Sequence, residues 1–301
     1  MANISAQLVK ELRERTGAGF MDCKKALVAA NGDIELAIDN MRKNGAVKAA
    51  KKSGRITAEG VIAGKADAGR AVIVEVNCET DFVATSDDFK NFVNQVVDVA
   101  FAADTDDVEK VKAAKLADGT TVQDALTALI AKLGENMNVR RVAVLHGDNL
   151  GFYIHSNKRI GVLCSLEGGN ADVAKDISMH IAALHPQFLR PSDVSAEVLE
   201  KERQIQTELE LKQNAELPED KRKPEAIIHK IIDGRMSKFS GEVSLYGQVF
   251  VKDSKQKVSA FLQANKAEVT TFIRFEVGEG IEKNTVDFAE EVKAQMAAAQ
   301  K

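Results

Sequence analysis

The sequence predicts an α+β protein built from several small parts, and three observations favour this class. The first 45 residues are punctuated as short helices, a pattern of two strands and an amphipathic helix occurs twice about 90 residues apart, and a highly charged helical stretch follows Pro191. A chain of 301 residues is long enough for two or three compact domains. We therefore expect separate small domains and not one continuous core.

The N-terminal segment predicts a bundle of three short helices. Ser5 and Asp33 are placed to cap the first and third helices, and turns at 16–19 and 31–32 separate the three. The third helix is expected to end at Gly45. The apolar positions expected to pack together are Leu8, Val9, Leu12, Cys23, Ala26, Leu27, Ala30, Ile34, Ala37, Ile38 and Met41. A bundle of this size offers little concavity for catalysis, so we expect it to present a surface.

Two features of this segment have alternative interpretations. Phe20 and Met21 directly follow a Gly-Ala-Gly turn, so they either complete the core or are displayed to solvent. Residues 42–55 carry basic side chains among alanines and glycines, which is typical of a linker or a fraying helix, or of a nucleic-acid patch. Because the segment has no aromatic residue for base stacking, we expect a solvated linker and no direct binding of nucleic acid.

Beyond the linker, the chain repeats a β-hairpin that leads into an amphipathic helix. The hairpin at residues 60–76 resembles the one at 151–166, and the helices that follow are expected at 88–101 and 172–184. The spacing is too long for a solenoid repeat and fits a two-part core of related subdomains. Each subdomain is expected to be a small antiparallel sheet with helices on one side.

Residues 75–84, EVNCETDFVA, change character in the middle. The apolar, β-branched run 71–76 predicts a buried strand, and Asp81 and Phe82 follow at its exit. In one interpretation Phe82 fills the core and Asp81 caps a helix that starts near Ser86. In the other, the ring and the carboxylate are presented to a partner.

The repeat isolates this pair as a difference between the two copies. We align TDFV at residues 80–83 with GGNA at residues 168–171. Because the second copy reaches its helix without an Asp–Phe pair, the shared fold does not require one. The pair is therefore a candidate for function.

After Pro191 the sequence predicts two thinly apolar helices joined by a polar loop. Ser195 is placed to cap the first helix, which runs to about Asn214, and residues 215–224 form the loop. The apolar stripes are Val198, Ile205 and Leu209 in the first helix and Ile227, Ile228, Ile231 and Ile232 in the second. Such helices form an antiparallel hairpin whose isoleucines pack either on their own domain or on another molecule, so dimerisation through the hairpin stays open.

The chain then returns to the core and ends in a helix. A strand is expected at residues 268–277, and a helix from Thr285 carries Phe288 on its apolar stripe. These patterns divide the chain into an N-terminal helical domain with its linker, a first core subdomain, the first part of a second, the hairpin insertion, the return of the second subdomain and a C-terminal helical module, at residues 1–55, 56–147, 148–190, 191–236, 237–282 and 283–301.

Composition and charge exclude several classes of protein. The chain has 45 acidic and 41 basic residues, so its net charge of -4 creates no general field for nucleic acid or an anionic membrane. The cysteines occur singly, without CxxC spacing, which indicates buried, reduced thiols and neither a disulfide framework nor a zinc site. No apolar run approaches the roughly 18 residues of a membrane span, so we expect a soluble, cytoplasmic protein without membrane contact.

The groups that covalent catalysis requires are also missing from the sequence. The glycine-rich stretch 64–69 is followed by Arg70 and Ala71, where a phosphate loop needs Lys and then Ser or Thr. No serine lies in a nucleophile elbow, and no cysteine has a local histidine partner. We predict that the protein is not an enzyme and has no catalytic residue, cofactor or metal. A scaffold or nucleic-acid-binding module is the competing class, and a metabolic enzyme is the third.

Two long motifs resemble the signature segments of a known family. LRERTGAGFMDCKKAL at residues 12–27 and EVNCETDFVA at 75–84 are similar to those of bacterial elongation factor Ts, the guanine-nucleotide exchange factor of elongation factor Tu. GRMSKFSGEVSL at 234–245 and FIRFEVGEGIEK at 272–283 agree with the same family. The resemblance covers essentially the whole chain and implies the family's layout, with an N-terminal three-helix domain, a two-part core, an inserted coiled-coil hairpin and a C-terminal helix.

The resemblance implies a role for the segment of Thr80, Asp81, Phe82 and Val83. The matching segment of the family enters the nucleotide domain of elongation factor Tu and dislodges the Mg²⁺ that is held with GDP. The implied partner is elongation factor Tu, in both its GDP-bound and its nucleotide-free forms, during translation elongation.

The resemblance also implies docking positions elsewhere in the chain. Arg13, Phe20 and Met21 match positions of the N-terminal domain that contact the same nucleotide domain. His155 falls where the second core subdomain meets another domain of the partner. The C-terminal helix near Phe288 matches a module that also contacts the nucleotide domain.

Overall fold

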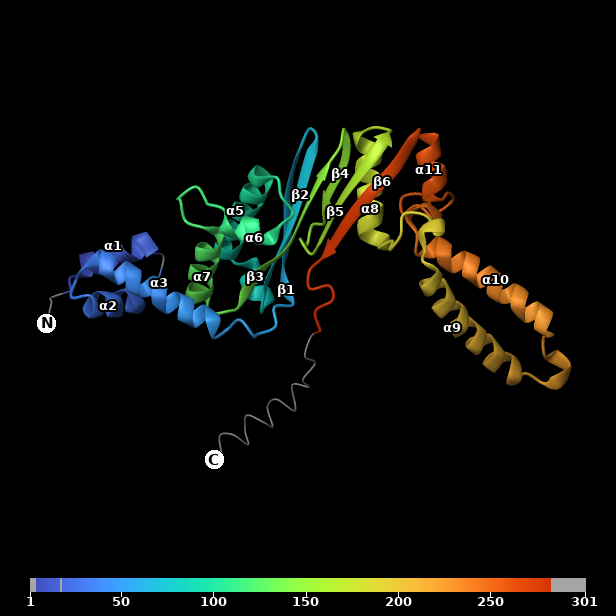
Figure 1. Cartoon of the computed structure of the whole chain (residues 1–301), viewed down its shortest axis with the longest axis horizontal. Helices are drawn as coiled ribbons and strands as arrows, with labels where there is room; N and C mark the ends of the chain where they lie inside the picture. Colours follow the sequence, from blue (N-terminus) through green and yellow to red (C-terminus); the bar gives the residue numbers. More distant parts are fainter. Residues whose placement is uncertain (1–3, 17, 283–301) are drawn as a thin grey trace, which may run out of the picture. The chain divides into compact units, whose positions relative to one another are not determined.

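The computed structural model describes residues 4–16 and 18–282, and within these ranges the protein is α+β, with helices and two three-stranded sheets (Figure 1). No helix in the described ranges is both long and apolar enough to span a membrane. Short 3-10 helices lie at Pro191–Asp193, Glu219–Lys221 and Leu245–Gly247. The strands are β1 (Glu59–Asp67), β2 (Arg70–Cys78), β3 (Met137–His146), β4 (Asn149–Ile154), β5 (Ile160–Gly168) and β6 (Ala267–Glu276). The α-helices are α1 (Ala6–Thr16), α2 (Phe20–Ala29), α3 (Ile34–Ala50), α4 (Asp81–Thr85), α5 (Asp87–Ala103), α6 (Val108–Ala113), α7 (Val122–Leu133), α8 (Ala171–Leu184), α9 (Ala196–Ala215), α10 (Glu225–Glu242) and α11 (Val258–Ala264).

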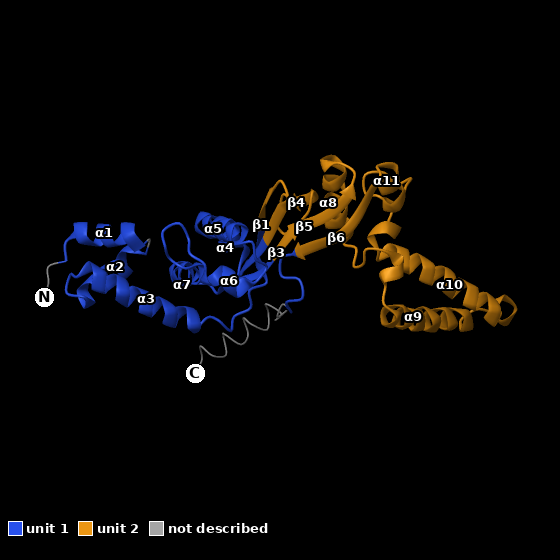
Figure 2. Cartoon of the chain, turned by 45° about the horizontal axis from the view of Figure 1, so that its top comes forward, with its two compact units in different colours: residues 1–62, 74–142, 276–301 blue, residues 63–73, 143–275 orange. Residues whose placement is uncertain are grey.

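The chain divides into two compact units (Figure 2). Of the described residues, the first unit contains 4–16, 18–62, 74–142 and 276–282, and the second contains 63–73 and 143–275. The division passes through strands β1, β2 and β3, so it does not follow a simple linker. The finer six-part division of the sequence stays a prediction.

The N-terminal helices form where the local signals place them. The Ser5 hydroxyl accepts a hydrogen bond from the Leu8 N–H at 3.1 Å, and the Asp33 carboxylate accepts one from the Leu36 N–H at 3.0 Å, which confirms both caps. The turn between α2 and α3 is closed by Asn31, which adopts a positive φ of 52°. The side chains that share the core are Val9, Leu12, Cys23, Leu27, Ala30 and Ala37.

The prediction that the third helix ends at Gly45 is wrong, whereas the expected solvation of residues 42–55 is confirmed for most of their side chains. Helix α3 runs to Ala50 and packs against α7, where buried Gly45 lies beside Ala131. After the helix, the Lys52 ammonium donates to the carbonyl of Gly134 at 2.6 Å. Gly45 therefore allows α3 to approach α7, whereas the basic side chains of residues 42–55 are exposed except that of Lys52, which is half-buried and reaches the carbonyl of Gly134.

The first sheet has the strand order β1-β2-β3. Residues 71–78 of β2 are all buried, as the apolar run predicted. Gly60 in β1 has a φ of 146°, and a Cβ atom there would overlap the carbonyl of Val76, so the close approach of the two strands requires glycine. The following helix α5 buries the apolar face formed by Phe89, Phe92, Val93, Val96, Val97 and Ala100.

The second sheet has the strand order β4-β5-β6, and β4 pairs antiparallel with β5 with Gly151 opposite Cys164. Helix α8 contacts both strands. The core that they share with α11 and β6 includes Val162, Cys164, Leu166, Val173, Ala174, Ile177, Ile181, Val258, Leu262 and Val269. The predicted repeat of hairpin and helix is thus confirmed, as is the predicted strand at the position of β6.

Helices α9 and α10 run side by side and contact each other (Figure 1). The Ser195 hydroxyl caps α9, as predicted, by accepting from the Val198 N–H at 3.3 Å. On the predicted apolar stripe of α9, Ile205 and Leu209 are 43% and 46% exposed, so these two side chains do not pack in the core of their own domain. The buried apolar residues of the pair lie on α10 and are Ile228, Ile232 and Met236, packed by Leu199 and Phe239.

The contact between α9 and α10 is instead partly ionic. Glu210 is buried on α9, and its carboxylate accepts from the Lys223 ammonium at 2.7 Å and from the Arg235 guanidinium at 2.6 Å. The hydrogen bond from Lys223 is the main cause of the lowered pKa of Glu210. Asn214 and Lys223 close the loop by exchanging two hydrogen bonds.

The remaining predictions concern the cysteines and the C-terminal helix. Cys23, Cys78 and Cys164 are all free and buried, as expected. Burial raises the pKa of the Cys78 thiol to about 12 and that of Cys164 to about 11, so both stay protonated at neutral pH. The helix predicted from Thr285, with Phe288, lies outside the described residues.

Candidate functional site

The candidate site is the turn between β2 and α5, where the chain forms the five-residue helix α4. Thr80 caps this helix, because its hydroxyl accepts from the Val83 N–H at 3.4 Å. At the other end, the Thr85 hydroxyl donates to the carbonyls of Asp81 and Phe82 at 3.1 and 3.0 Å. Ser86 then leaves the helical conformation and caps α5. Two caps six residues apart thus confine α4 to a single turn.

The single turn separates its side chains into an inner and an outer pair. Val83 and Ala84 are buried, whereas the Phe82 side chain is 84% exposed. Asp81 is also exposed, and its carboxylate makes no hydrogen bond or ion pair with any described residue. The interpretation that Phe82 fills the core and that Asp81 caps the next helix is therefore wrong. A large apolar ring and a carboxylate face solvent together.

The caps also correct the alignment of the two copies. Thr80 caps α4, and Asn170 caps α8 by accepting from the Val173 N–H at 3.0 Å, so these two residues are equivalent. The buried Val83 then corresponds to the buried Val173, and Phe82 corresponds to Asp172, which is exposed. The alignment of residues 80–83 with 168–171 is therefore wrong by two residues, because the capping positions fix where each helix starts.

The turn is held by a loop that is distant in sequence. Glu135 follows α7, and its two carboxylate oxygens accept from the Thr80 N–H at 3.0 Å and from the Thr80 hydroxyl at 2.6 Å. Glu79, the residue before Thr80, accepts from the Asn136 N–H at 2.5 Å and pairs with Arg55 at 3.3 Å. The predicted linker therefore reaches the base of the candidate site.

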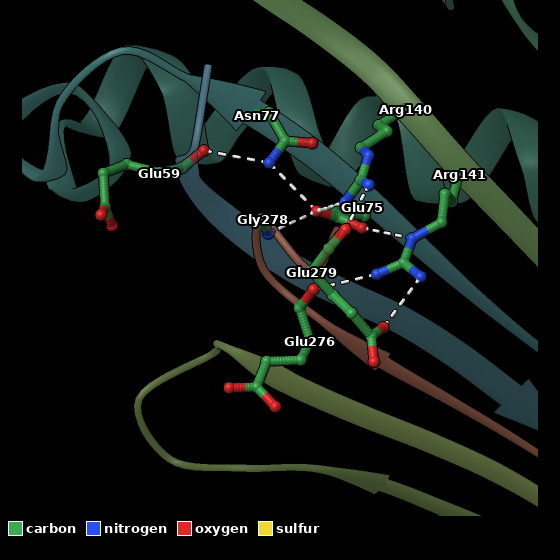
Figure 3. Close-up of polar contacts among 8 residues, drawn as sticks. All are labelled: Glu59, Glu75, Asn77, Arg140, Arg141, Glu276, Gly278 and Glu279. Carbon is green, nitrogen blue, oxygen red and sulfur yellow. Dashed lines mark hydrogen bonds and ion pairs between the residues drawn. The ribbon is translucent and has the colours of Figure 1, made fainter. Parts of the chain in front are cut away.

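A buried carboxylate stabilises the strand that leads into the turn (Figure 3). Glu75 is fully buried in β2 and pairs with Arg140 at 3.0 Å and with Arg141 at 2.5 Å. It also accepts from the Asn77 amide at 3.0 Å and from the Gly278 N–H at 2.9 Å. Sequence reasoning missed this network, although a single glutamate inside an apolar strand and a later Arg-Arg pair were visible signals.

The same network anchors the segment that follows β6. Arg141 donates to the carbonyl of Glu276 at 2.9 Å and pairs with the Glu279 carboxylate at 3.1 Å, and Arg140 donates to the Glu279 carbonyl (Figure 3). Burial alone would raise the pKa of Glu75. The hydrogen bond from the Gly278 N–H and the charge of Arg141 outweigh it and lower the pKa, so the carboxylate stays ionised at neutral pH.

The predicted N-terminal contact residues lie on α1 and α2. Phe20 and Met21 open α2 and are 49% and 58% exposed, so they are displayed and not part of the core. Arg13 on α1 is exposed as well. Met21 also lines a shallow cleft of about 300 Å³ on the surface of α2, together with Lys24, Lys25, Val28 and Ala29. The surface combines apolar and basic side chains.

His155 directly follows β4 and belongs to the second unit, whereas the other predicted residues that the structure describes belong to the first. Its ring is half-buried, and its Nδ1 lies 2.8 Å from the Tyr153 hydroxyl. Its backbone N–H donates to the carbonyl of Ile160, which closes the hairpin between β4 and β5. Phe288 lies outside the described residues.

Two comparisons with known proteins point to the same family. A family model described as "Elongation factor TS" matches residues 79–279. A curated elongation factor Ts of Aeromonas hydrophila subsp. hydrophila is 55% identical over 301 residues, which is 100% of both chains. That of Pseudoalteromonas atlantica is 53% identical over 298 residues, 99% of each chain, and that of Escherichia coli O139:H28 is 54% identical over 294 residues, 98% of each.

Proposed function

Because the chain belongs to the elongation factor Ts family, whose role lies in translation elongation, we propose that it is a guanine-nucleotide exchange factor. It binds elongation factor Tu in the GDP-bound form and promotes release of GDP. It also binds the nucleotide-free form, which then takes up GTP. The exchange changes no covalent bond, so the protein acts by binding and not as an enzyme.

The observation that carries this proposal is the exposure of Phe82. A phenylalanine that is 84% exposed loses the favourable free energy that burial would give it, and the fold does not require it, since Asp172 occupies the equivalent position in the second copy. The caps and the Glu135 contacts hold the turn in one conformation. The ring is therefore presented for insertion into a partner.

The size of the ring suits the energy that exchange needs. An acceleration of GDP release by three decades requires about 4 kcal/mol of differential stabilisation, at roughly 1.4 kcal/mol for each factor of ten. Burial of one phenylalanine supplies about 1.5–3 kcal/mol. Phe82 contributes this amount to exchange only if its pocket exists in the nucleotide-displaced state and not in the ground state. The wider docking surface supplies the rest.

Asp81 adds an electrostatic contribution to the same step. Its exposed carboxylate enters beside the ring and approaches the phosphates and the Mg²⁺ that the partner holds. A negative charge there repels the diphosphate and competes for the cation or its bound waters. Thr80 and Val83 complete the segment by capping α4 and by anchoring it in the core.

The other contacts with elongation factor Tu are distributed over the chain. Arg13, Phe20 and Met21 form the surface that docks on the nucleotide domain, and His155 contacts another domain of the partner. Exposed apolar side chains on α2 support the first assignment. Phe288 belongs to the C-terminal module, which completes the docking on the nucleotide domain.

The family's layout supports a finer description of the parts. Helices α1 to α3 act as a three-helix docking domain, and α9 and α10 form a coiled-coil hairpin inserted in the second subdomain. The exposed Ile205, Leu209 and Ile227 are available for dimerisation through this hairpin. The protein works without cofactor, membrane or direct nucleic-acid contact, in the cytoplasm.

The function is tested by fluorescent-GDP release from the cognate elongation factor Tu in a stopped-flow instrument. The protein is expected to accelerate release by orders of magnitude, with saturation as its concentration rises. A pull-down at moderate salt is expected to retain the nucleotide-free partner better than the GDP-bound one, because binding and nucleotide affinity are linked reciprocally. Unchanged GDP release, together with bound nucleic acid that washes off steeply with salt, would favour the scaffold class instead.

A further inference from the structure

We propose that Glu135 is a positioning residue for Phe82, because its carboxylate fixes the one-turn helix that displays the ring. The effect on nucleotide exchange rests on the function proposed above, whereas the effect on the conformation of the turn does not. Glu135 belongs to none of the motifs that suggested the function, and it lies 55 residues after Thr80 in the chain.

The contacts of Glu135 replace a missing part of a helix cap. In a capping box, the third residue of the helix carries a Glu or Gln that accepts from the backbone N–H of the capping residue. In α4 this third residue is Val83, which is buried and has no polar group. Glu135 supplies the acceptor from outside the helix, since one of its oxygens binds the Thr80 N–H at 3.0 Å.

The second oxygen of Glu135 fixes the side chain of Thr80. It accepts from the Thr80 hydroxyl at 2.6 Å, so the hydroxyl hydrogen points to Glu135 and a lone pair remains for the Val83 N–H. The cap of α4 and the clamp from Glu135 therefore share one threonine rotamer. Hydrogen bonds to a charged acceptor are stronger than those between neutral groups, which favours this single arrangement.

The loop that carries Glu135 is itself held in place. The Asn136 amide donates to the carbonyls of Ser53 and Arg55 at 3.3 and 2.9 Å, and the Asn136 N–H donates to Glu79. Glu79 precedes Thr80. Hydrogen bonds therefore run from the turn to the loop, at Thr80 and Glu135, and from the loop to the turn, at Asn136 and Glu79. Glu135 thus acts from a fixed base, and its position defines that of α4.

A helix of one turn needs such an external constraint. The first turn of a helix is unfavourable in isolation, because several backbone angles are fixed for few hydrogen bonds. Without Glu135, α4 is expected to populate several conformations, of which only a fraction presents Phe82 correctly. Entry of the ring then becomes slower, whereas docking through the other surfaces changes little.

The kinetic test compares Glu135→Ala, Glu135→Gln and the control Glu109→Ala in the GDP-release assay. Glu109 lies on α6 in the same unit, and its side chain is 80% exposed and pairs with Lys112 at 3.0 Å. For Glu135→Ala we expect a maximal release rate about tenfold lower, with a half-saturating concentration within about twofold of the parent. Glu135→Gln is expected to recover part of the rate, because its amide oxygen still accepts one of the two hydrogen bonds from Thr80. Glu109→Ala is expected to match the parent.

A spectroscopic test reads the turn without the partner. The chain contains no tryptophan, so Phe82→Trp places a single indole at the tip of α4. In this background, Glu135→Ala is expected to increase the amplitude of the fast component in the time-resolved anisotropy decay, and Glu109→Ala to leave it unchanged. Circular dichroism of each variant checks that the fold persists.

The outcomes separate the two proposals. If Phe82→Ala releases GDP as fast as the parent, the proposed mechanism fails, and the anisotropy still decides whether Glu135 orders the turn. If Phe82→Ala is slow but Glu135→Ala equals the parent in both rate and anisotropy, the positioning role is overturned. A higher half-saturating concentration with an unchanged maximal rate also overturns it, since Glu135 would then contribute to docking. If Glu135→Ala fails to fold, Glu135→Gln decides, and parental behaviour of that variant overturns the role.

Discussion

The two junctions between strand and helix, at β2–α4 and at β5–α8, solve the same folding problem with different residues. In both, a polar side chain caps the helix and a valine three residues later is buried, at Val83 and Val173. The first junction then ends its helix after one turn, whereas α8 continues to Leu184. The second residue of the helix is Phe82 in α4 and Asp172 in α8.

The means of support also differ between the junctions. The first depends on long charged side chains, with Glu79 and Glu135 bound to Asn136 and Thr80. The second depends on the backbone, because Gly168 adopts a φ of 69° and a Cβ atom there would overlap the carbonyl of Lys266. The shared fold therefore needs only a cap and a buried valine. The exposed ring, the short helix and the contacts of Glu135 are additional, and the proposed function in binding accounts for them.

The largest effect is expected where the first sheet differs most from the second. Glu75 is buried and pairs with Arg140 and Arg141, whereas the equivalent residue in β5 is Ser165. Glu75→Ala leaves two arginines without their shared partner and should lower the free energy of unfolding by about 3–5 kcal/mol. Ser165→Ala should change it by less than about 0.5 kcal/mol. Urea unfolding followed by circular dichroism measures both, and equal losses would show that the ionic network adds no stability.

The second prediction concerns the ring itself. Phe82→Ala should slow the GDP release stimulated at saturation by about 10- to 100-fold, which corresponds to the 1.5–3 kcal/mol of one buried phenylalanine. Complex formation should remain detectable. Phe82→Asp, which copies Asp172 of the second junction, should be at least as slow. Stopped-flow rates with fluorescent GDP decide the matter, and Asp172→Ala serves as the matched control with the parental rate.

A smaller effect is expected for the carboxylate beside the ring. Asp81→Ala should slow release by less than tenfold, because an exposed charge acts through a screened field. Its signature should be a weaker dependence of the release rate on Mg²⁺ concentration. If the dependence on Mg²⁺ is the same in the variant and the parent, the electrostatic part of the mechanism is wrong. Asp87→Ala, on the exposed first turn of α5, is the charge-matched control.

The smallest expected effect is on the pH dependence of stability, and it concerns a difference between α5 and α8. Helix α5 buries only apolar side chains, whereas α8 buries His180, whose Nε2–H donates to Gln248 at 2.9 Å and whose Nδ1 accepts from the Val251 N–H at 3.1 Å. The Gln248 amide nitrogen donates to the carbonyl of Glu242, so its oxygen faces the imidazole and fixes this neutral tautomer. Burial lowers the pKa of His180 below its ordinary value of 6.5.

The sign of the pH effect follows from the lowered pKa of His180. Below pH 6.5 the unfolded chain takes up a proton that the folded protein does not, so the stability that His180 contributes is complete above pH 6.5 and decreases as the pH falls below it. Unfolding free energies at pH 7.5 and 5.5 should therefore differ less in His180→Asn than in the parent. The exposed His229 provides the control, since His229→Gln should keep the parental difference.

Much of the fold could be predicted because its signals are local. The caps at Ser5, Asp33 and Ser195, the buried strand β2 and the repeat of hairpin and helix all depend on residues within one or two turns of each other. The family motifs identified the segment of the candidate site in the same way. The errors came from long-range packing, as at α3, which continues past Gly45 because α7 lies beside it.

The sequence by itself determined the starts of α1, α3 and α9, the repeat of hairpin and helix, and that TDFV follows a buried strand. It left two interpretations of Phe82 open, since a local pattern does not say whether a ring at a strand's end meets its own core or solvent. Tertiary structure decided this, because Val83 and Ala84 pack in the core and leave Phe82 exposed, and because Glu135, from a loop 55 residues away, contacts Thr80. Burial and long-range hydrogen bonds depend on which distant segments meet, and that information is not contained in the periodicity of any single segment.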